Sequence, residues 1–343
     1  MIDYTRNISL RPYNTFGVDV NAAHLFYLKS PDQLQELLDF PGFIEMSGNM
    51  SQLLVMGQGS NILFTGDFHG VVVRNEITGI RVIDEDESSV VIEAGSGVIW
   101  NDLVDFAVGR GWWGIENLAL IPGTVGAAPV QNIGAYGAEA ADVILRVRAF
   151  HLQNREWLVF ENRECGFGYR DSIFKRELRN KTIICSVVLR LSKKGRPMLD
   201  YSGIREELDK MDVSEPSAMD ISVAVASVRR SKLPDPSILG NAGSFFKNPV
   251  VSEAEHLRLL AAFPALRAHR QGDHYKIPAA WLIEQAGWKG FREGDAGSYE
   301  KQPLILVNYG NATGKEILKI SERIQESVFS IFGISLEREV NVK

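Results

Sequence analysis

Cysteine is scarce in this sequence, and its histidines are not paired. The two cysteines, Cys165 and Cys185, are too few for a disulfide framework and lack the CxxC spacing of a metal or redox pair. We therefore expect two buried, reduced thiols. The six histidines are scattered without HxxxH or HxH spacing, so the sequence predicts no metal site.

Long hydrophobic runs and an excess of positive charge are also missing. No stretch approaches the roughly 20 apolar residues of a membrane span, and the first residues lack the apolar run of a signal peptide. We expect a cytoplasmic protein that does not bind a membrane. The net charge of -6 argues against a nucleic-acid-binding protein, although it allows a local basic pocket for a phosphorylated ligand.

The composition is that of a globular protein, with 45% apolar and 23% charged residues over 343 positions. This length favours two or three domains. Short runs rich in valine and isoleucine predict strands, and one run with apolar residues on a single face predicts a helix. The strands are expected at 53–56, 70–73, 80–83, 90–94, 143–151, 157–160 and 182–191, and the helix at 100–109. This order indicates an α+β fold.

The last third has a more helical pattern. Helices are expected at 251–263, with Ser252 as the N-cap, at 279–286, between Pro278 and Gly287, and at 313–332. A strand is expected at 304–307. The polar segment 211–219 is the expected boundary zone before this part.

The first chemical signal is the turn Gly57-Gln58-Gly59-Ser60-Asn61, directly after an expected strand. Small residues after a strand let backbone N–H groups approach a phosphate, and the exposed donors form an anion-binding nest. The spacing is that of neither a P-loop nor a Rossmann fingerprint. A tight strand-to-strand turn explains these residues equally well.

The second signal is a stretch from Ile121 to Gly137 with four glycines, three alanines and two prolines. Such a run forms neither a long helix nor a continuous strand. It provides a surface with few side chains, against which a flat ligand and its diphosphate can pack. A structural loop is the alternative.

The two turns resemble the FAD-binding fold of the vanillyl-alcohol oxidase (PCMH-type) superfamily. Six sequence elements, which occur in this order, limit the resemblance to one family within this superfamily: Asn14-Thr15-Phe16-Gly17, Gly57 to Asn61, Ile121 to Gly126, Tyr169-Arg170-Asp171-Ser172, Gly240 to Pro249 and Lys276 to Ile283. Together they are similar to UDP-N-acetylenolpyruvoylglucosamine reductases of the longer subtype, which carries a tyrosine loop. The resemblance covers nearly the whole chain. The serine and Tyr-Arg-Asp-Ser motifs are specific, whereas other flavoproteins share the glycine turns.

This resemblance implies a fold and two cofactors. It implies two α+β FAD-binding subdomains, at 1–75 (joined by 334–343) and 76–215, and a C-terminal α+β domain at 216–333 that binds the UDP-sugar. FAD is held noncovalently and NADPH donates hydride. The protein is expected to act as a monomer in peptidoglycan precursor synthesis. The matched FAD-binding residues are Gly57, Gln58, Gly59, Ser60, Asn61, Pro122, Gly123, Thr124, Gly126, Ala127, Gly134 and Ala135.

The implied reaction reduces an enolpyruvyl ether on a UDP-linked amino sugar. Flavin N5 delivers hydride to the vinyl carbon, and a proton is then added beside the carboxylate. The resemblance assigns Ser244 as the proton donor, Arg170 as the cation at the carboxylate and Glu339 as a second catalytic group. Each has an alternative: Ser244 can cap a turn, Arg170 can form a salt bridge with Asp171, and Glu337 competes with Glu339.

The resemblance also assigns substrate contacts. Lys232 matches a diphosphate contact and Arg229 helps to orient it, while Asn248 and Gln302 match polar contacts. Tyr201 matches a loop tyrosine that closes over the substrate. The basic residues near 230 can instead form a solvated helix face, and Tyr201 can be an ordinary loop residue.

Three further expectations complete the interpretation. The chain ends four residues after Glu339, so we expect the end to fray. We expect Trp112 and Trp113 to serve packing. Two other functions compete: a flavin-dependent alcohol or sugar oxidase of the same superfamily, and a nucleotide-sugar-binding protein without catalysis.

Overall fold

The computed structural model describes residues 2–201 and 203–343 and divides into two compact units. Unit 1 comprises Met1–Ile8, Ala22–Gln58 and Phe68–Ser231, and unit 2 comprises Ser9–Asn21, Gly59–Asp67 and Lys232–Lys343. Each unit is therefore assembled from stretches that are far apart in the sequence. The three-domain division expected from the sequence stays a prediction.

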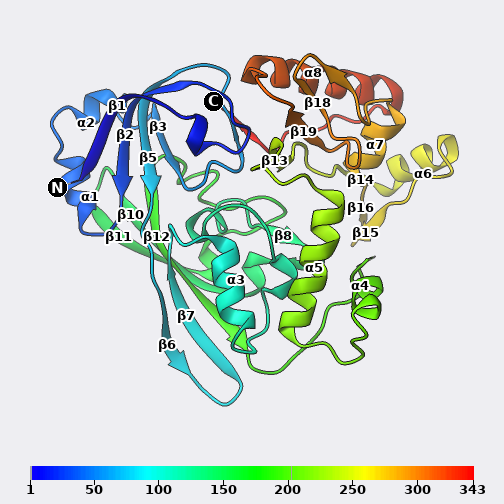
Figure 1. Cartoon of the computed structure of the whole chain (residues 1–343), viewed down its shortest axis with the longest axis horizontal. Coiled ribbons are helices and arrows are strands. Elements are labelled where there is room, and N and C mark those ends of the chain that lie inside the picture. Colours follow the sequence, from blue (N-terminus) through cyan, green and yellow to red (C-terminus); the bar gives the residue numbers. More distant parts are fainter. Residues whose placement is uncertain (1, 202) are drawn as a thin grey trace. The chain divides into compact units, whose positions relative to one another are not determined.

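Unit 1 contains a four-stranded sheet in the order β1-β2-β5-β3 (Figure 1). In its centre β5 pairs in parallel with β2 and with β3, and its middle residues 70–73 are all buried, as parallel strands require. Two short helices contribute Leu34, Leu37 and Phe43 to its core. The elements are β1 (Asp3–Ser9), β2 (Asn21–Leu28), α1 (Gln33–Leu38), α2 (Phe43–Met46), β3 (Leu53–Met56) and β5 (Phe68–Asn75).

A second, five-stranded sheet of unit 1 has the order β11-β10-β12-β7-β6 and is antiparallel throughout. The central strand β12 buries seven successive residues, 183–189, which explains its nearly continuous apolar run. The edge strand β6 is mostly exposed. The strands are β6 (Ile80–Glu85), β7 (Ser89–Gly95), β10 (Ile144–His151), β11 (Glu156–Glu161) and β12 (Thr182–Ser192).

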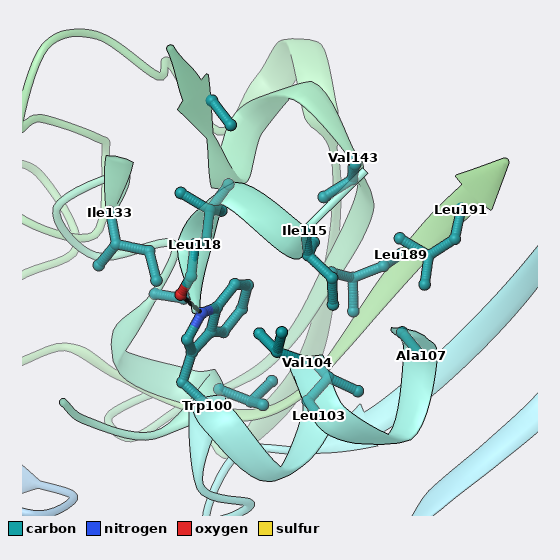
Figure 2. Close-up of a cluster of buried hydrophobic side chains, with 14 of the residues drawn as sticks. Trp100, Leu103, Val104, Ala107, Ile115, Leu118, Ile133, Val143, Leu189 and Leu191 are labelled. Atoms are coloured by element: carbon teal, nitrogen blue, oxygen red, sulfur yellow. Dashed lines mark hydrogen bonds between the residues drawn. The ribbon is translucent and has the colours of Figure 1, made fainter. Parts of the chain in front are cut away.

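Helix α3 (Trp100–Val108) builds the core beside this sheet. Figure 2 shows its Trp100, Leu103 and Val104 directed toward Ile115 and Leu118 of the following segment. The indole N–H of Trp100 donates to the carbonyl of Leu118 over 3.0 Å, so the single polar atom of this ring is satisfied inside an apolar cluster.

The glycine-rich stretch after α3 forms only short elements, as its composition predicts. Two helices then follow β12. The short elements are η2 (Glu116–Leu118), η3 (Val125–Ala127), β8 (Gly134–Ala135), β9 (Ala138–Glu139) and η4 (Ala140–Asp142), and the two helices are α4 (Ile204–Lys210) and α5 (Ala218–Lys232). A further short helix, η5 (Asn162–Glu164), lies between β11 and β12.

Unit 2 combines a sheet in the order β13-β19-β18-β17 with a smaller sheet, β14-β16-β15. Its longest helix begins after Thr313, whose hydroxyl accepts from the Glu316 N–H while the Glu316 carboxylate accepts from the Thr313 N–H. The elements are η1 (Arg11–Tyr13), β4 (Ile62–Leu63), β13 (Gly240–Ser244), β14 (Val250–Ser252), α6 (Glu253–Ala262), β15 (His269–Gln271), β16 (His274–Lys276), α7 (Ala279–Gln285), β17 (Arg292–Glu293), β18 (Ala296–Ser298), β19 (Ile305–Asn308), α8 (Gly314–Phe332) and β20 (Asn341–Val342).

The strands and helices expected from the sequence are confirmed, with bounds that shift by a few residues. The α+β class is confirmed as well. Both cysteines are buried and free, as expected. Burial raises the pKa of each thiol to about 12. Among the described residues, no helix is both long and apolar enough to cross a membrane.

The expectation of a frayed chain end is wrong. Residues Asn341 and Val342 form β20, which pairs in parallel with β4. Beyond them, the N–H of Thr65 donates to the carbonyl of Lys343 over 2.7 Å. A neighbouring strand edge supplies the backbone partners that the last residues need, so the segment after Glu339 is held.

Candidate active site

The two glycine turns predicted to bind the cofactor touch each other in unit 1. The N–H of Gly123 donates to Oε1 of Gln58 over 2.8 Å. A β-carbon built onto Gly57 would lie 2.3 Å from Oγ1 of Thr124, so only glycine allows this approach. Gln58 and Gly123 thus join two segments that the sequence analysis linked only by resemblance.

Gly126 continues this close backbone packing. Its N–H donates to the carbonyl of Ser96 over 2.8 Å, and a β-carbon there would lie 2.5 Å from Cβ of Ser96. Gly126 lies on the short helix η3, with Thr124 at the N-cap and Ala127 as the last residue. The result is a surface of backbone and small side chains, which fits a flat ligand with a diphosphate. The residues present therefore suit FAD.

The rest of the first turn, Gly59, Ser60 and Asn61, belongs to unit 2. Gly59 has a φ of +65°, which glycine adopts without strain, and the chain here connects β3 to β4. The strand-to-strand alternative therefore describes the local geometry correctly and is compatible with phosphate binding. The side-chain amide of Asn61 donates to the carbonyl of Glu339 over 3.3 Å.

Arg170 is fixed against the second glycine stretch within unit 1. Its guanidinium donates to the carbonyls of Gly134 and Asn132, over 2.5 and 3.2 Å. A β-carbon on Gly134 would come within 3.2 Å of Nη1 of Arg170, so Gly134 also serves the arginine. Asp171 forms its ion pair with Arg176, rather than the expected alternative pairing with Arg170.

Ser244 is presented by a bulge at the end of β13. The register of β13 against β19 is interrupted between Asn241 and Ser244, Gly243 has a φ of +69°, and the Gly243 N–H donates to Oδ1 of Asn241 over 2.9 Å. Bulges with a left-handed glycine redirect the next side chain. Ser244 is exposed, while Phe245 and Phe246 after it are fully buried and anchor the strand.

Glu339 lies on the backbone segment that pairs with the residues after Ser244. The N–H of Glu339 donates to the carbonyl of Phe245 over 2.9 Å, and the N–H of Lys247 donates to the carbonyl of Glu337 over 2.8 Å. The carboxylate of Glu337 forms an ion pair with Lys247 at 2.5 Å.

Two predicted substrate contacts lie in unit 1, one on a helix and one in the loop between β12 and α4. Arg229 is on the last part of α5, and its buried Nε has no hydrogen-bond partner among the described residues. Burial raises the pKa of Tyr136, although the charge of Arg229 and the hydrogen bond between the two side chains act to lower it. Burial lowers the pKa of Arg229 itself. Tyr201 is 50% exposed.

The other predicted substrate contacts lie in unit 2. Lys232 is the exposed last residue of α5. Oδ1 of Asn248 accepts from the Ala279 N–H over 2.8 Å, so Asn248 also satisfies a donor at the start of α7. Oε1 of Gln302 is buried without a hydrogen-bond partner in the described part of the chain.

Sequence reasoning did not assign roles to Asn117 and Tyr136. Tyr136 stood inside the glycine-rich stretch, but no pattern connected it to Arg229. Asn117 is 1% exposed, and its amide bonds to residues far away in the sequence, which no local spacing could reveal. The described residues contain no group of three or more side chains suited to hold a metal ion.

Comparison with known families agrees with this arrangement. Residues 22–154 match the FAD binding domain family, and residues 235–343 match the C-terminal domain of UDP-N-acetylenolpyruvoylglucosamine reductase. The fold and the glycine turns therefore define an FAD-binding oxidoreductase.

Full-length relatives make the assignment narrower. The chain is 44% identical over 340 residues to a reductase of Chromobacterium violaceum, with 98% of each chain covered. It is 44% identical over 342 residues to one of Pseudomonas aeruginosa, with 99% of each covered. Both are named UDP-N-acetylenolpyruvoylglucosamine reductase. The chain belongs to the UDP-N-acetylenolpyruvoylglucosamine reductase family.

A solved structure of this family supports the same conclusion. The reductase of Thermus caldophilus matches with a TM-score of 0.66 and 26% identity, covering 100% of this chain and 98% of that one. The similarity thus extends across both units and is not confined to the FAD-binding part. The expected FAD-binding α+β fold is confirmed.

Proposed function

We propose that Ser244, Arg170 and Glu339 carry the reaction of this family in the present chain. The protein is an oxidoreductase that converts UDP-N-acetyl-3-O-(1-carboxyvinyl)-glucosamine to UDP-N-acetylmuramate with noncovalent FAD and NADPH. The chemistry that bound FAD would supply is hydride transfer, from NADPH to the vinyl carbon of the substrate. What remains for the protein is to hold the carboxylate and to place one proton.

The observation that carries this proposal is the bulge that presents Ser244. A serine hydroxyl is a weak acid, so it donates a proton effectively only when it is held against a strongly basic carbon. The carbon beside the substrate carboxylate becomes such a base after hydride addition. Gly243 and the buried Phe245 and Phe246 fix the backbone on both sides of Ser244, which supplies the required positioning.

Arg170 and Glu339 complete the proposed catalytic set. Two backbone carbonyls orient the Arg170 guanidinium, and a planar, permanently charged fork suits a carboxylate that gains electron density. Glu339 is half-buried and paired through its backbone to Phe245. We assign it a share in protonation beside Ser244.

Two of the residues that we propose to contact the substrate have a buried polar atom without a partner in the part of the chain that the structure describes. A buried polar atom without a partner costs free energy, and both Nε of Arg229 and Oε1 of Gln302 are in this state. A bound nucleotide-sugar would supply the missing acceptor and donor. Lys232 contributes a cation for the diphosphate, Asn248 adds a polar contact, and Tyr201 covers the ligand from its loop.

We also propose that the protein acts as a cytoplasmic monomer in peptidoglycan precursor synthesis. Its cosubstrate NADPH and its UDP-linked substrate are intracellular metabolites, and the two buried thiols suit a reducing compartment. Analytical ultracentrifugation of the purified protein tests the oligomeric state, and a stable dimer at micromolar concentration would contradict it.

One preparation tests the catalytic proposal. The purified protein should show the visible absorbance of oxidised flavin, and NADPH should be consumed rapidly only when the enolpyruvyl UDP-sugar is added. Equal consumption with and without that sugar would remove the reductase assignment. Consumption of oxygen with an alcohol or sugar would instead support an oxidase.

A further inference from the structure

The segment that carries Tyr201 is attached to the core of unit 1 at two places before it reaches the tyrosine. Ser192 and Trp113 exchange two backbone hydrogen bonds, of 2.8 and 3.0 Å. A β-carbon on Gly195 would lie 2.7 Å from the Trp113 ring, so glycine lets the segment pass closely over this indole. Trp113 therefore packs as expected, and the surface it packs against is the base of the tyrosine segment.

The second attachment is the side-chain amide of Asn117. Its Nδ2 donates to the carbonyl of Met198 over 3.1 Å and to the carbonyl of Tyr136 over 2.9 Å. One amide group thus joins the tyrosine segment to the Gly134–Gly137 turn. Because both acceptors are backbone carbonyls, the connection does not depend on the side chains at positions 136 and 198.

Asn117 can act as a fixed point because its own backbone is held in the core. It lies on η2 and is 1% exposed. The next residue, Leu118, is fully buried and accepts the Trp100 indole N–H, as Figure 2 shows. A polar side chain on such a platform has little freedom to follow a moving loop.

Tyr201 rests on the turn that Asn117 holds. Its ring contacts the Tyr136 ring edge-on, with centroids 6.2 Å apart and an interplanar angle of 75°. A β-carbon on Gly137 would lie 3.0 Å from the Tyr201 ring. Since half of Tyr201 is exposed, contacts with this turn are what keep the ring in place.

We propose that Asn117 is a positioning residue that fixes the tyrosine segment on the Gly134–Gly137 turn and so presents Tyr201 to the UDP-sugar. The inference rests on the substrate-covering role proposed for Tyr201. It concerns binding and not chemistry, because the side-chain amide of Asn117 acts through two backbone carbonyls of its own unit.

The test compares Asn117→Ala with a matched variant. The amide of Asn162 also donates to two backbone carbonyls, those of Ala141 and Ile144, each over 2.8 Å, but it holds another part of unit 1. Asn117→Ala should raise KM for the UDP-sugar about tenfold, roughly the size of a net hydrogen bond or two, with kcat within about twofold. Asn162→Ala should leave both constants near the wild-type values.

Two additional measurements distinguish the attachment of the tyrosine segment by Asn117 from the role of Tyr201 in substrate binding. Amide hydrogen exchange in residues 195–201 should become faster in Asn117→Ala and not in Asn162→Ala. Equal exchange in the two variants would show that Asn117 does not hold the tyrosine segment. In a Tyr201→Ala background, Asn117→Ala should add no further rise in KM. A full additional rise would show that Asn117 does not act through Tyr201.

A different result is expected if Tyr201 does not cover the substrate. If Tyr201→Ala leaves KM unchanged, the substrate-covering role of Tyr201 is wrong, while the exchange measurement still decides whether Asn117 anchors the segment. Asn117→Asp, which keeps the size but removes the amide donors, repeats the comparison if the alanine variant does not fold.

Discussion

The glycine turns of unit 1 and the serine strand of unit 2 are built in opposite ways. At the turns, Gly57 and Gly126 bring backbones so close that an added methyl group would collide with Thr124 or Ser96. At the strand, Ser244 is exposed and stands after a glycine that meets no atom within 4 Å. The glycine turns depend on residues that lack a side chain, whereas the serine strand depends on one exposed side chain, that of Ser244.

This difference separates stability from function. A close backbone fit contributes to folding and to the shape of the cofactor surface together, so a change there should affect both. An exposed hydroxyl at a strand end contributes almost nothing to folding, so a change there should affect turnover alone. Substitutions of equal size in the two regions should therefore give different results.

The largest expected effect is that of Ser244→Ala. Loss of the proposed proton donor should lower kcat about 10²- to 10⁴-fold, while thermal unfolding and the rate of flavin reduction by NADPH stay close to wild type. Stopped-flow absorbance separates the two half-reactions. Ser335→Ala, which removes another exposed serine of unit 2, is the control. Normal sugar turnover in Ser244→Ala would exclude this serine from the mechanism.

A smaller effect, but on stability, is expected for Gly126→Ala. The added methyl group meets Ser96 at 2.5 Å, and such overpacking costs about 1–3 kcal/mol. The unfolding free energy should fall, and less flavin should remain bound after purification. Gly66→Ala is the control, because a β-carbon there meets no atom within 4 Å. If the two variants have equal stability and flavin content, the close packing of Gly126 against Ser96 contributes to neither property.

The sequence predicted these two regions unequally well. The strand Leu53–Met56 and the N-cap Ser252 of α6 are confirmed because period and capping are local properties. The bulge at Gly243 was not predicted, since it depends on how β13 pairs with β19.

Other features were beyond the reach of local patterns. Helix α5 was not predicted, because its mixture of alanine, serine and valine has little amphipathic period. The frayed end was wrongly expected because the partner of β20, strand β4, lies at the other end of the sequence. Asn117 was missed since its two acceptors are set by tertiary packing alone.

Gln302→Leu should give a still smaller effect that distinguishes binding from folding. The buried Oε1 of Gln302 lacks a partner in the described chain, so its loss should leave the unfolding free energy unchanged or slightly higher. The KM for the UDP-sugar should rise about tenfold, since the variant lacks the side-chain oxygen that we propose accepts a hydrogen bond from the ligand. Gln285→Leu, at an exposed position of α7, is the control. A clear loss of stability in Gln302→Leu would indicate a structural role instead.

The smallest expected effect concerns pH and Glu116 in unit 1. This carboxyl is 4% exposed and accepts from the Gly114 N–H over 2.6 Å. Burial raises its pKa above the ordinary 4.5, against the opposing hydrogen bonds. A carboxyl with a raised pKa binds its proton more tightly in the folded state. Its contribution to stability is therefore complete below about pH 4.5 and is lost as pH rises through the raised pKa.

Glu116→Gln removes this titration while keeping an oxygen acceptor for Gly114. Its unfolding free energy should depend less on pH between pH 4 and 7 than that of the wild type. Urea unfolding across this range measures the difference, and kcat should not change. Parallel pH profiles would mean that the Glu116 pKa is not raised. A fall in kcat would mean that the Glu116 carboxyl has a functional role in addition to its effect on stability.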